Sequence, residues 1–494
     1  MGVLALFAEQ ISAKFIVAIL STCAVAWLMQ TRFSQQTEFP LINQFPRDWN
    51  RKKAEAAFVQ DAQKLIREGF RKFGGPFRII TLLGTSVVLP TEYAEWVRQS
   101  PDVSHQALAA EQFFAKYPGF EGETAVSHAD GLLINVIKAK LSQNKFSVLF
   151  MNSATKFLKN IWTDNKEWHD IYWAKDGTEL IGQMSSSIFV GDHLASNAEW
   201  QKTSISYAIN MFQGARALRT WPAWTRPLIH WFIPECNVCR AEVKKADSLI
   251  QAELQRRSMS GGRYDDTITW MHQAAKGRPY NATANQLGLS MAAVVTTSEL
   301  LKQCLVELCA SSVLIAPLRE EIEQVISQHG WTGAALAQMQ LMDSIIKETQ
   351  RLNPLSEVNL ERKVIRTTTL PNGQVLPAGT NISVHTASLL DPSIYPNPII
   401  FDGARFLKLR RAGGKWENAA SAVSTSAEHF VFGLGRFICP GRFMAIAEVK
   451  IALAIILSEY DVRFVEGYVP KTVRYGFEIL GDPEAQLQVK KRAL

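Results

Sequence analysis

The chain has 494 residues, of which 47% are hydrophobic and 20% are charged. This balance is typical of a globular protein with enough apolar material for a buried core, and it excludes extensive disorder. The formal net charge of +7 favours an anionic membrane surface or an acidic protein partner, and no recognisable nucleic-acid module surrounds the short basic runs near the chain ends, so no nucleic-acid partner is expected.

The N-terminal segment has the composition of a membrane anchor. No residue from Phe15 to Thr31 is charged, and extension back to Ile11 gives about 21 positions, enough to cross a bilayer as a helix. Positive charges are more frequent after this segment than before it, which places the body of the protein in the cytosol. We therefore predict an anchor over residues 1–32, with its transmembrane helix at about 11–31.

A cleaved signal peptide is the alternative for this segment. Ala24-Val25-Ala26 has the small-x-small form of a cleavage site within the apolar run. The cysteines favour a reducing compartment, because the six positions (23, 236, 239, 304, 309 and 439) do not form a disulfide framework. Cys236 and Cys239 would supply only two of the four ligands of a structural zinc site, so zinc is not expected.

After the anchor, Phe39-Pro40 and Phe45-Pro46 indicate an extended passage, because a proline disfavours helical geometry in the residue before it. We interpret residues 33–50 as a hinge and residues 51–494 as one domain without an internal linker. Residues 51–73 have helical apolar spacing. Residues 77–89 predict two strands that turn at Gly84-Thr85.

From about residue 130 to 352 the pattern is one helix after another. Strand-like runs follow between Arg362 and Val384, around the turn signal Pro371-Asn372-Gly373, and residues 411–429 have the composition of a surface loop. The predicted fold class is mainly α with small β-sheets (α+β).

The sharpest motif is Phe432-Gly433-Leu434-Gly435-Arg436-Phe437-Ile438-Cys439-Pro440-Gly441, directly before an apolar helical stretch from Arg442 to Leu457. Glycines let a backbone pass close to a flat ligand. A thiolate bound to iron needs N–H donors and a helix N-terminus near its sulfur, and Pro440 suits the first helical turn. A buried free cysteine before a helix would explain Cys439 but not the glycines on both sides.

This loop resembles that of the cytochrome P-450 family, which implies the cytochrome P-450 fold and haem b as cofactor. The resemblance implies that Cys439 is the axial ligand of the haem iron. It also implies that the haem is held by a set of cofactor-binding residues, namely Phe432, Gly433, Gly435, Arg436, Gly441 and Arg362.

The resemblance extends to three charged residues. Glu348 and Arg351 stand at i and i+3 in Glu348-Thr349-Gln350-Arg351, so they share one helix face. Arg405, in Phe401-Asp402-Gly403-Ala404-Arg405-Phe406, is similar to the arginine that joins this pair in the family. We expect a buried triad that stabilises the haem-side core.

The stretch Leu289 to Ser298 resembles the oxygen-side helix of the family. Thr296 matches the threonine whose hydroxyl helps to deliver protons to bound oxygen. The alternative is a hydroxyl that donates back to the carbonyl of Ala292 and bends the helix. The expected substrate pocket is apolar and includes Met291, Ala292, Val295 and Val358.

Two positions depart from the family pattern. Val295 stands where many members have Asp or Glu, so proton delivery cannot use that side chain. Phe437 stands where the family commonly has His or Arg directed at a haem propionate. Arg436, one position away, and Arg362 are the expected propionate partners.

The resemblance implies a monooxygenase that uses O2 and NADPH-derived electrons, delivered by NADPH-cytochrome P-450 reductase, to oxidise an apolar small molecule. Its local sequence patterns are similar to those of fungal family members that act in secondary metabolism, often in terpenoid pathways. The expected location is the endoplasmic reticulum membrane, with one pass through the lipid bilayer and the domain facing the cytosol. The alternatives are a haem-thiolate isomerase or dehydratase that does not consume O2, and a membrane haem protein without catalysis.

Overall fold

The computed structural model describes residues 15, 17–19, 21–22, 38–141 and 145–493. Most of the predicted membrane helix, residues 11–31, lies outside the described residues, and so does the first part of the predicted hinge. The fold is therefore described from residue 38 onward.

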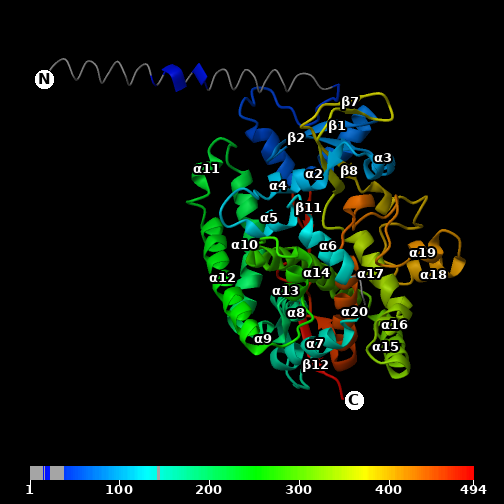
Figure 1. The fold of residues 1–494 in the computed structure, drawn as a ribbon. Coiled ribbons are helices and arrows are strands. Elements are labelled where there is room, and N and C mark those ends of the chain that lie inside the picture. Colours follow the sequence, from blue (N-terminus) through cyan, green and yellow to red (C-terminus); the bar gives the residue numbers. More distant parts are fainter. Residues whose placement is uncertain (1–14, 16, 20, 23–37, 142–144, 494) are drawn as a thin grey trace.

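The fold is mainly helical with small sheets, which confirms the predicted class (Figure 1). The longer helices, in chain order, are α2 (Lys52–Phe73), α4 (His105–Gln112), α6 (Leu132–Lys140), α7 (Ser147–Ile161), α8 (Trp173–Phe189), α10 (Ala198–Arg219), α12 (Pro234–Ser260), α13 (Thr267–Ala275), α14 (Ala282–Ala310), α15 (Ile315–His329), α17 (Gln340–Leu352), α18 (Arg405–Ala412) and α20 (Arg442–Glu459). The shorter ones are α3 (Ala94–Gln99), α5 (Glu121–Val126), α9 (Gly191–Ala195), α11 (Arg226–Ile229), α16 (Gly333–Gln338) and α19 (Trp416–Ala419).

Helix α14 runs through the centre of the molecule (Figure 1). It packs against α5, α8, α10, α12, α17 and α20, and apolar side chains lie around most of its circumference, as expected for a helix that other elements cover on most sides. Among the described residues it is the one helix long and apolar enough to cross a membrane, and 56% of that apolar window is buried inside the protein. Its composition is therefore explained by its position in the core.

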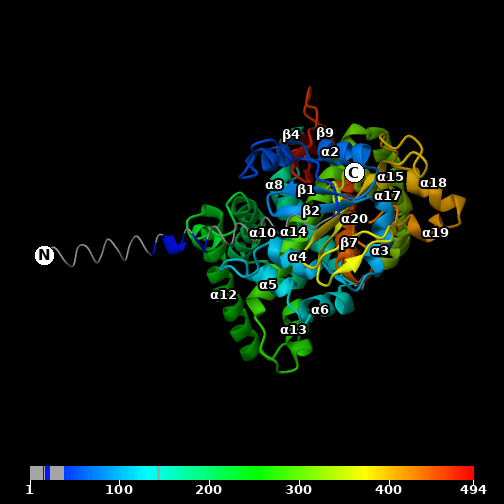
Figure 2. The same cartoon turned by 90° about the horizontal axis from the view of Figure 1, so that it is seen from above.

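The largest sheet joins segments from both halves of the chain. Its strand order is β1-β2-β8-β5-β3; β2 and β8 are parallel and the other neighbours are antiparallel. These strands are β1 (Phe77–Thr81), β2 (Gly84–Leu89), β3 (Val103–Ser104), β5 (Val358–Val364) and β8 (Asn381–His385). Seen from above in Figure 2, β1, β2 and α3 lie over the central helices, so this sheet covers one end of the helical body.

Three smaller sheets complete the fold, with orders β4-β12-β9, β10-β11 and β6-β7. Their strands are β4 (His169–Tyr172), β6 (Thr368–Thr369), β7 (Val375–Leu376), β9 (Tyr460–Phe464), β10 (Val473–Tyr475), β11 (Glu478–Leu480) and β12 (Gln486–Lys491).

The sequence-based prediction was wrong at three places. The first hairpin turns at residues 82–83, because Gly84 already pairs with Thr81 in the ladder. Strand β4 interrupts the region predicted as helices only, since its four residues are too few for a clear alternating pattern and it is paired by the distant strand β12. Helix α19 lies within the predicted loop 411–429.

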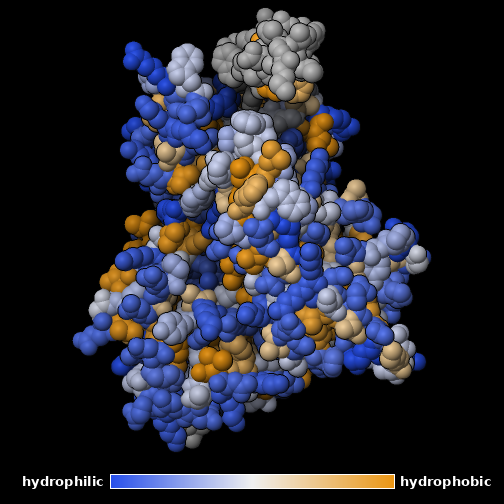
Figure 3. Space-filling model, turned by 90° about the vertical axis from the view of Figure 1, so that its left-hand side faces the viewer, coloured by the Kyte–Doolittle hydropathy of each residue, from blue (hydrophilic) through white to orange (hydrophobic). Residues whose placement is uncertain are grey.

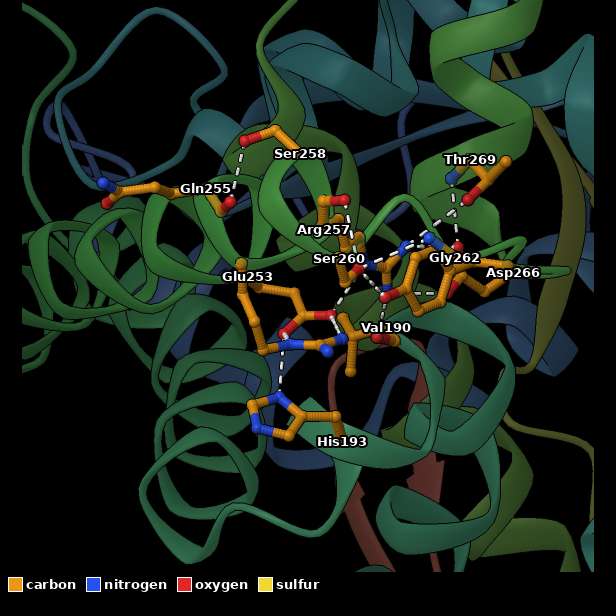
Figure 4. A network of polar contacts seen from close by, with 12 residues as sticks. Val190, His193, Glu253, Gln255, Arg257, Ser258, Ser260, Gly262, Asp266 and Thr269 are labelled. Carbon is orange, nitrogen blue, oxygen red and sulfur yellow. Dashed lines mark hydrogen bonds and ion pairs between the residues drawn. The ribbon is translucent and has the colours of Figure 1, made fainter.

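A buried ion network fixes the end of α12 to α9 and α13 (Figure 4). Glu253 accepts hydrogen bonds from Arg256, Arg257 and His193, and Arg257 also binds both carboxylate oxygens of Asp266 at 2.7 and 2.9 Å. Burial alone would raise the pKa of Glu253, but these donors outweigh it and hold the pKa at about 2.

Because the folded-state pKa of Glu253 lies below the ordinary value of 4.5, its ionisation stabilises the fold above about pH 4.5, and this contribution is lost as the pH falls towards 2. We expect Glu253→Gln to lower the free energy of unfolding by about 2 kcal/mol at pH 6. The difference in unfolding free energy between the variant and the wild type should be smaller at pH 3, as measured by urea unfolding. Glu199→Gln, which removes an exposed pair with Lys245, is the control; a gap that stays constant with pH contradicts the assignment.

Candidate active site

Cys439 lies at the end of a tight loop that leads into α20. Its backbone N–H donates to the carbonyl of Phe432 at 2.8 Å, which closes the loop on itself. Gly433 and Gly435 have φ values of 75° and 66°, the left-handed region that glycine adopts at low cost. A Cβ on Gly435 would lie 2.7 Å from the side chain of Arg98, so the close approach also requires glycine.

The surroundings of the Cys439 thiol have opposing effects on its pKa. Burial raises the pKa, whereas the backbone N–H groups of Gly441 and Arg442 and the guanidinium of Arg442 lower it. The guanidinium of Arg442 also donates to the carbonyl of Cys439 at 2.9 Å. Donors are therefore in place for a thiolate, and a cation bound to the sulfur would supply the remaining stabilisation.

Midway along α14 one turn is left uncovered by the neighbouring elements. Ala292 and Thr296, one turn apart, are exposed, although Leu289 to Met291 before them and Thr297 to Glu299 after them are buried. Because α14 packs against other helices on either side of this turn, we infer that these side chains face a space within the protein. The small side chain of Ala292 leaves room there for a ligand.

The hydroxyl of Thr296 donates to the carbonyl of Ala292 at 2.7 Å. This is the back-bonded geometry that the sequence left as an alternative. The oxygen of Thr296 keeps its lone pairs, so it can accept from a ligand or water, and it donates to one only when the bond to Ala292 is exchanged.

The expected pocket residues differ in their exposure. Val295 is half-buried, whereas Met291 and Val358 are 5% and 1% exposed and belong to the packed core. Met291 and Val358 therefore offer a ligand little accessible surface, because core packing on their own sides of α14 and β5 covers them. Ala292 is the predicted pocket residue with the most open position.

Arg362 is buried at 3% exposure on β5, and its guanidinium is under-satisfied. Its Nη1 donates to the carbonyl of Glu361 at 2.8 Å, while its Nε has no partner. Burial lowers its pKa to about 10, opposed by Glu361. A buried guanidinium with so few acceptors indicates that an anion belongs beside it.

A β-bulge directs Arg362. The register between β5 and β8 shifts between Asn359 and Arg362, and Leu360 within the bulge has a φ of 51° although it is not glycine. Asn359 stabilises the bulge by accepting from the N–H of Leu360 at 2.6 Å and donating to the carbonyl of Val431 at 3.1 Å. The bulge is thereby tied to the cysteine loop.

Arg436 contacts the β3 segment and Phe437, and its role towards a propionate stays a prediction. It is exposed, and its Nη2 donates to the backbone carbonyl of Val103 at 2.5 Å. Its guanidinium lies 4.6 Å from the ring centre of Phe437, whose other neighbour is Arg362 at 5.0 Å. The Nη2 group of Arg436 is therefore used by the backbone of the β3 segment.

The three charged residues of the predicted triad meet in the core. Glu348 and Arg351 on α17 are fully buried, with two contacts of 2.8 Å between them, and Arg405 at the start of α18 donates to Glu348 at 2.9 Å. The remaining N–H groups of both arginines donate to backbone carbonyls between residues 389 and 400. The triad thus fastens α17 to the segment that leads towards the cysteine loop.

Sequence reasoning missed several polar residues that support this region. Asp343 on α17 binds Lys450 at 2.8 Å and Arg410 at 2.9 Å, and Lys347 donates to two carbonyls of the loop before the cysteine motif. Asn359 was also missed. An asparagine inside a strand pattern is a usable signal, because asparagine is depleted in strands and marks irregular positions such as bulges.

The comparisons with known proteins agree with this geometry. The cytochrome P450 family model matches residues 106–490. The chain is 36% identical over 482 residues to cytochrome P450 monooxygenase ntnM of Nectria sp, with 96% of this chain and 92% of that protein covered. It is 36% identical to cytochrome P450 monooxygenase hepE of Aspergillus oryzae, with coverages of 96% and 89%.

The fold has a counterpart among solved structures. The crystal structure of the cytochrome P450DA heme domain superimposes with a TM-score of 0.71, covering 92% of this chain and 97% of that one, at 16% sequence identity. At this identity the likeness concerns the fold alone.

We expect Arg405→Ala to lower the free energy of unfolding by about 3–5 kcal/mol, because Glu348 would keep a buried charge with one fewer partner. Urea unfolding followed by circular dichroism measures the loss. Arg366→Ala, which removes an exposed pair with Asp102, should change it by less than about 1 kcal/mol. Equal effects of the two substitutions would contradict a structural role for the triad.

Proposed function

This chain belongs to the cytochrome P450 family of monooxygenases, and we propose that it inserts one oxygen atom from O2 into an apolar small molecule with Cys439 as the axial thiolate ligand of haem b. The observation that carries the proposal is the position of Cys439, in a closed glycine loop lined with N–H donors, directly before α20, which packs against α14.

The residues around this space fit a haem. The exposed surface of Ala292 and Thr296 and the half-buried Cys439 leave room for a flat ligand inside the protein. The unpartnered Nε of the buried Arg362 fits a carboxylate of such a ligand. Phe432, Gly433, Gly435 and Gly441 would contribute the backbone and ring surface on the thiolate side.

Bound haem supplies the centre at which dioxygen is activated with two electrons. Each residue of the chain then has a separate task. Cys439 holds the thiolate, stabilised by the N–H groups of Gly441 and Arg442. Ala292 leaves the space open, and Thr296 passes a proton through its Oγ1 when its bond to Ala292 is exchanged for one to water.

We propose that the electrons come from NADPH through NADPH-cytochrome P450 reductase. The proposal follows from family membership and from a positive net charge that suits an acidic partner. Val295 and Ala292 make the exposed turn of α14 apolar, which supports an apolar substrate. The fungal sources of the relatives support a role in secondary metabolism, and we propose a terpenoid-type substrate.

We propose that the protein is attached to the endoplasmic reticulum membrane by its N-terminal helix, with the domain in the cytosol. Exposed aromatic and aliphatic side chains around α11 support a membrane contact: Trp221, Trp224, Leu228, Trp231 and Phe232 are between 44% and 83% exposed. This segment adjoins the start of α2, since Lys52 donates to the carbonyl of Thr220. Figure 3 views the molecule from this side and shows apolar patches among polar ones.

The proposed activity is tested with microsomes that contain the protein and a reductase. Candidate terpenoids should gain one oxygen atom, detected by mass spectrometry, only when both NADPH and O2 are present. Cys439→Ser should abolish the product and the thiolate signature in the Soret band of the reduced carbon monoxide complex. Turnover without O2, or an unshifted Soret band in Cys439→Ser, would refute the proposal.

Removal of the Thr296 hydroxyl should separate electron use from product formation. We expect Thr296→Ala to bind haem normally but to release most of its reducing equivalents as hydrogen peroxide, lowering product per NADPH roughly tenfold. Thr296→Ser keeps the hydroxyl and should retain most of the coupling. Unchanged coupling in Thr296→Ala would mean that the bond to Ala292 serves only the helix.

A further inference from the structure

We propose that His105 is a second haem-binding residue, which together with Arg362 holds one propionate in place of the donor that position 437 lacks. The inference rests on the proposed haem site. It concerns which residues bind the carboxylate end of the cofactor, on the side of the cysteine loop that faces α4 and β5.

His105 is the first residue of α4, directly after β3. Its Nδ1 lies 3.3 Å from the carbonyl oxygen of Glu361, the same oxygen that accepts from Nη1 of Arg362 at 2.8 Å. One carbonyl therefore places the imidazole and the guanidinium side by side. The bulge of β5 presents this carbonyl, so the backbone irregularity serves both side chains.

The imidazole of His105 combines two properties of a residue at an internal space. Burial, and then the positive charge of Arg362, lowers its pKa to about 4, so protein surrounds it. Its side chain is nevertheless exposed, and its ring centre lies 6.2 Å from that of Phe437, two residues before Cys439. We infer that the exposed part faces the haem space.

The neighbouring positions of the loop leave room for a further donor. Phe437 has no polar atom in its side chain, and its ring contacts the guanidiniums of Arg362 and Arg436. Arg436 donates to the carbonyl of Val103. The buried Arg362, whose Nε has no partner, needs an anion, and His105 is the polar side chain bonded to the same carbonyl.

The chemistry of the pair suits a carboxylate. Since a carbonyl only accepts, Nδ1 of His105 donates to Glu361, and Nε2 is the ring atom left for a ligand. A carboxylate at Nε2 stabilises a second proton on the ring, taken from solvent, so that both ring nitrogens donate. The charged group that acts on the imidazole is Arg362, which is itself close to Arg436; the carboxylate of Glu361 is bound by Gln112.

The test combines two changes in a double-mutant cycle: one removes the imidazole of His105, and the other masks the charge of the haem propionates. Full-length wild type and His105→Ala are each loaded with haem or with its propionate dimethyl ester, and release to excess apomyoglobin is timed. We expect His105→Ala to release haem about tenfold faster than wild type, the factor of one charge-assisted hydrogen bond, and to release the ester less than twofold faster. His105→Gln, which keeps a donor, should recover part of the difference.

The control is His169→Ala on β4, whose imidazole is also bonded through Nδ1 to a backbone carbonyl; it should release both cofactors at the wild-type rate. A His105→Ala variant that releases haem and ester equally faster, or neither faster, overturns the proposal. The Soret band of the reduced carbon monoxide complex reports the thiolate separately. If the wild-type complex lacks the Soret position of a thiolate ligand, Cys439 is not the haem ligand, whatever the release rates are.

Discussion

The carboxylate of Glu348 is the charge on which the arrangement of this core depends. A carboxylate with no solvent contact is stable only if cations and donors replace the water that it has lost. Arg351 supplies two of these bonds from the same helix, and Arg405 supplies another from a segment more than fifty residues later. Because each guanidinium also binds backbone carbonyls between residues 389 and 400, neutralising one charge fixes the path of the chain towards the cysteine loop.

The features that sequence predicted well are those whose cause is local. The triad pair lies within one turn of α17, and the loop around Cys439 needs glycines at positive φ. Both can therefore be recognised in the sequence as short motifs. The fold class was predictable because helical spacing dominates a long stretch of chain. Hairpin β1–β2 was predicted as well, although its turn was placed two residues too late.

The features that sequence did not predict depend on partners far away in the chain. Strand β4 is short and exists because β12, about 315 residues later, pairs with it. Met291 and Val358 match an apolar pocket in pattern, and how far each is buried is decided by tertiary packing. The bond from Thr296 to Ala292 was foreseen only as an alternative, since one turn of helix permits either geometry.

The departures from the family pattern at Val295 and Phe437 also show the difference between local motifs and contacts that depend on distant parts of the chain. A motif shows that a polar group is missing, but the group that compensates can come from any element that folds against the loop. At Phe437 the structure brings a buried, under-satisfied guanidinium and an imidazole to one carbonyl, from β5 and α4, which are about 250 residues apart in the chain. The left-handed φ of Leu360 costs backbone energy, and its persistence is explained if the bulge must direct Arg362 at an anion. When a motif lacks an expected polar side chain, the group that replaces it is thus best sought on the neighbouring strands and helices.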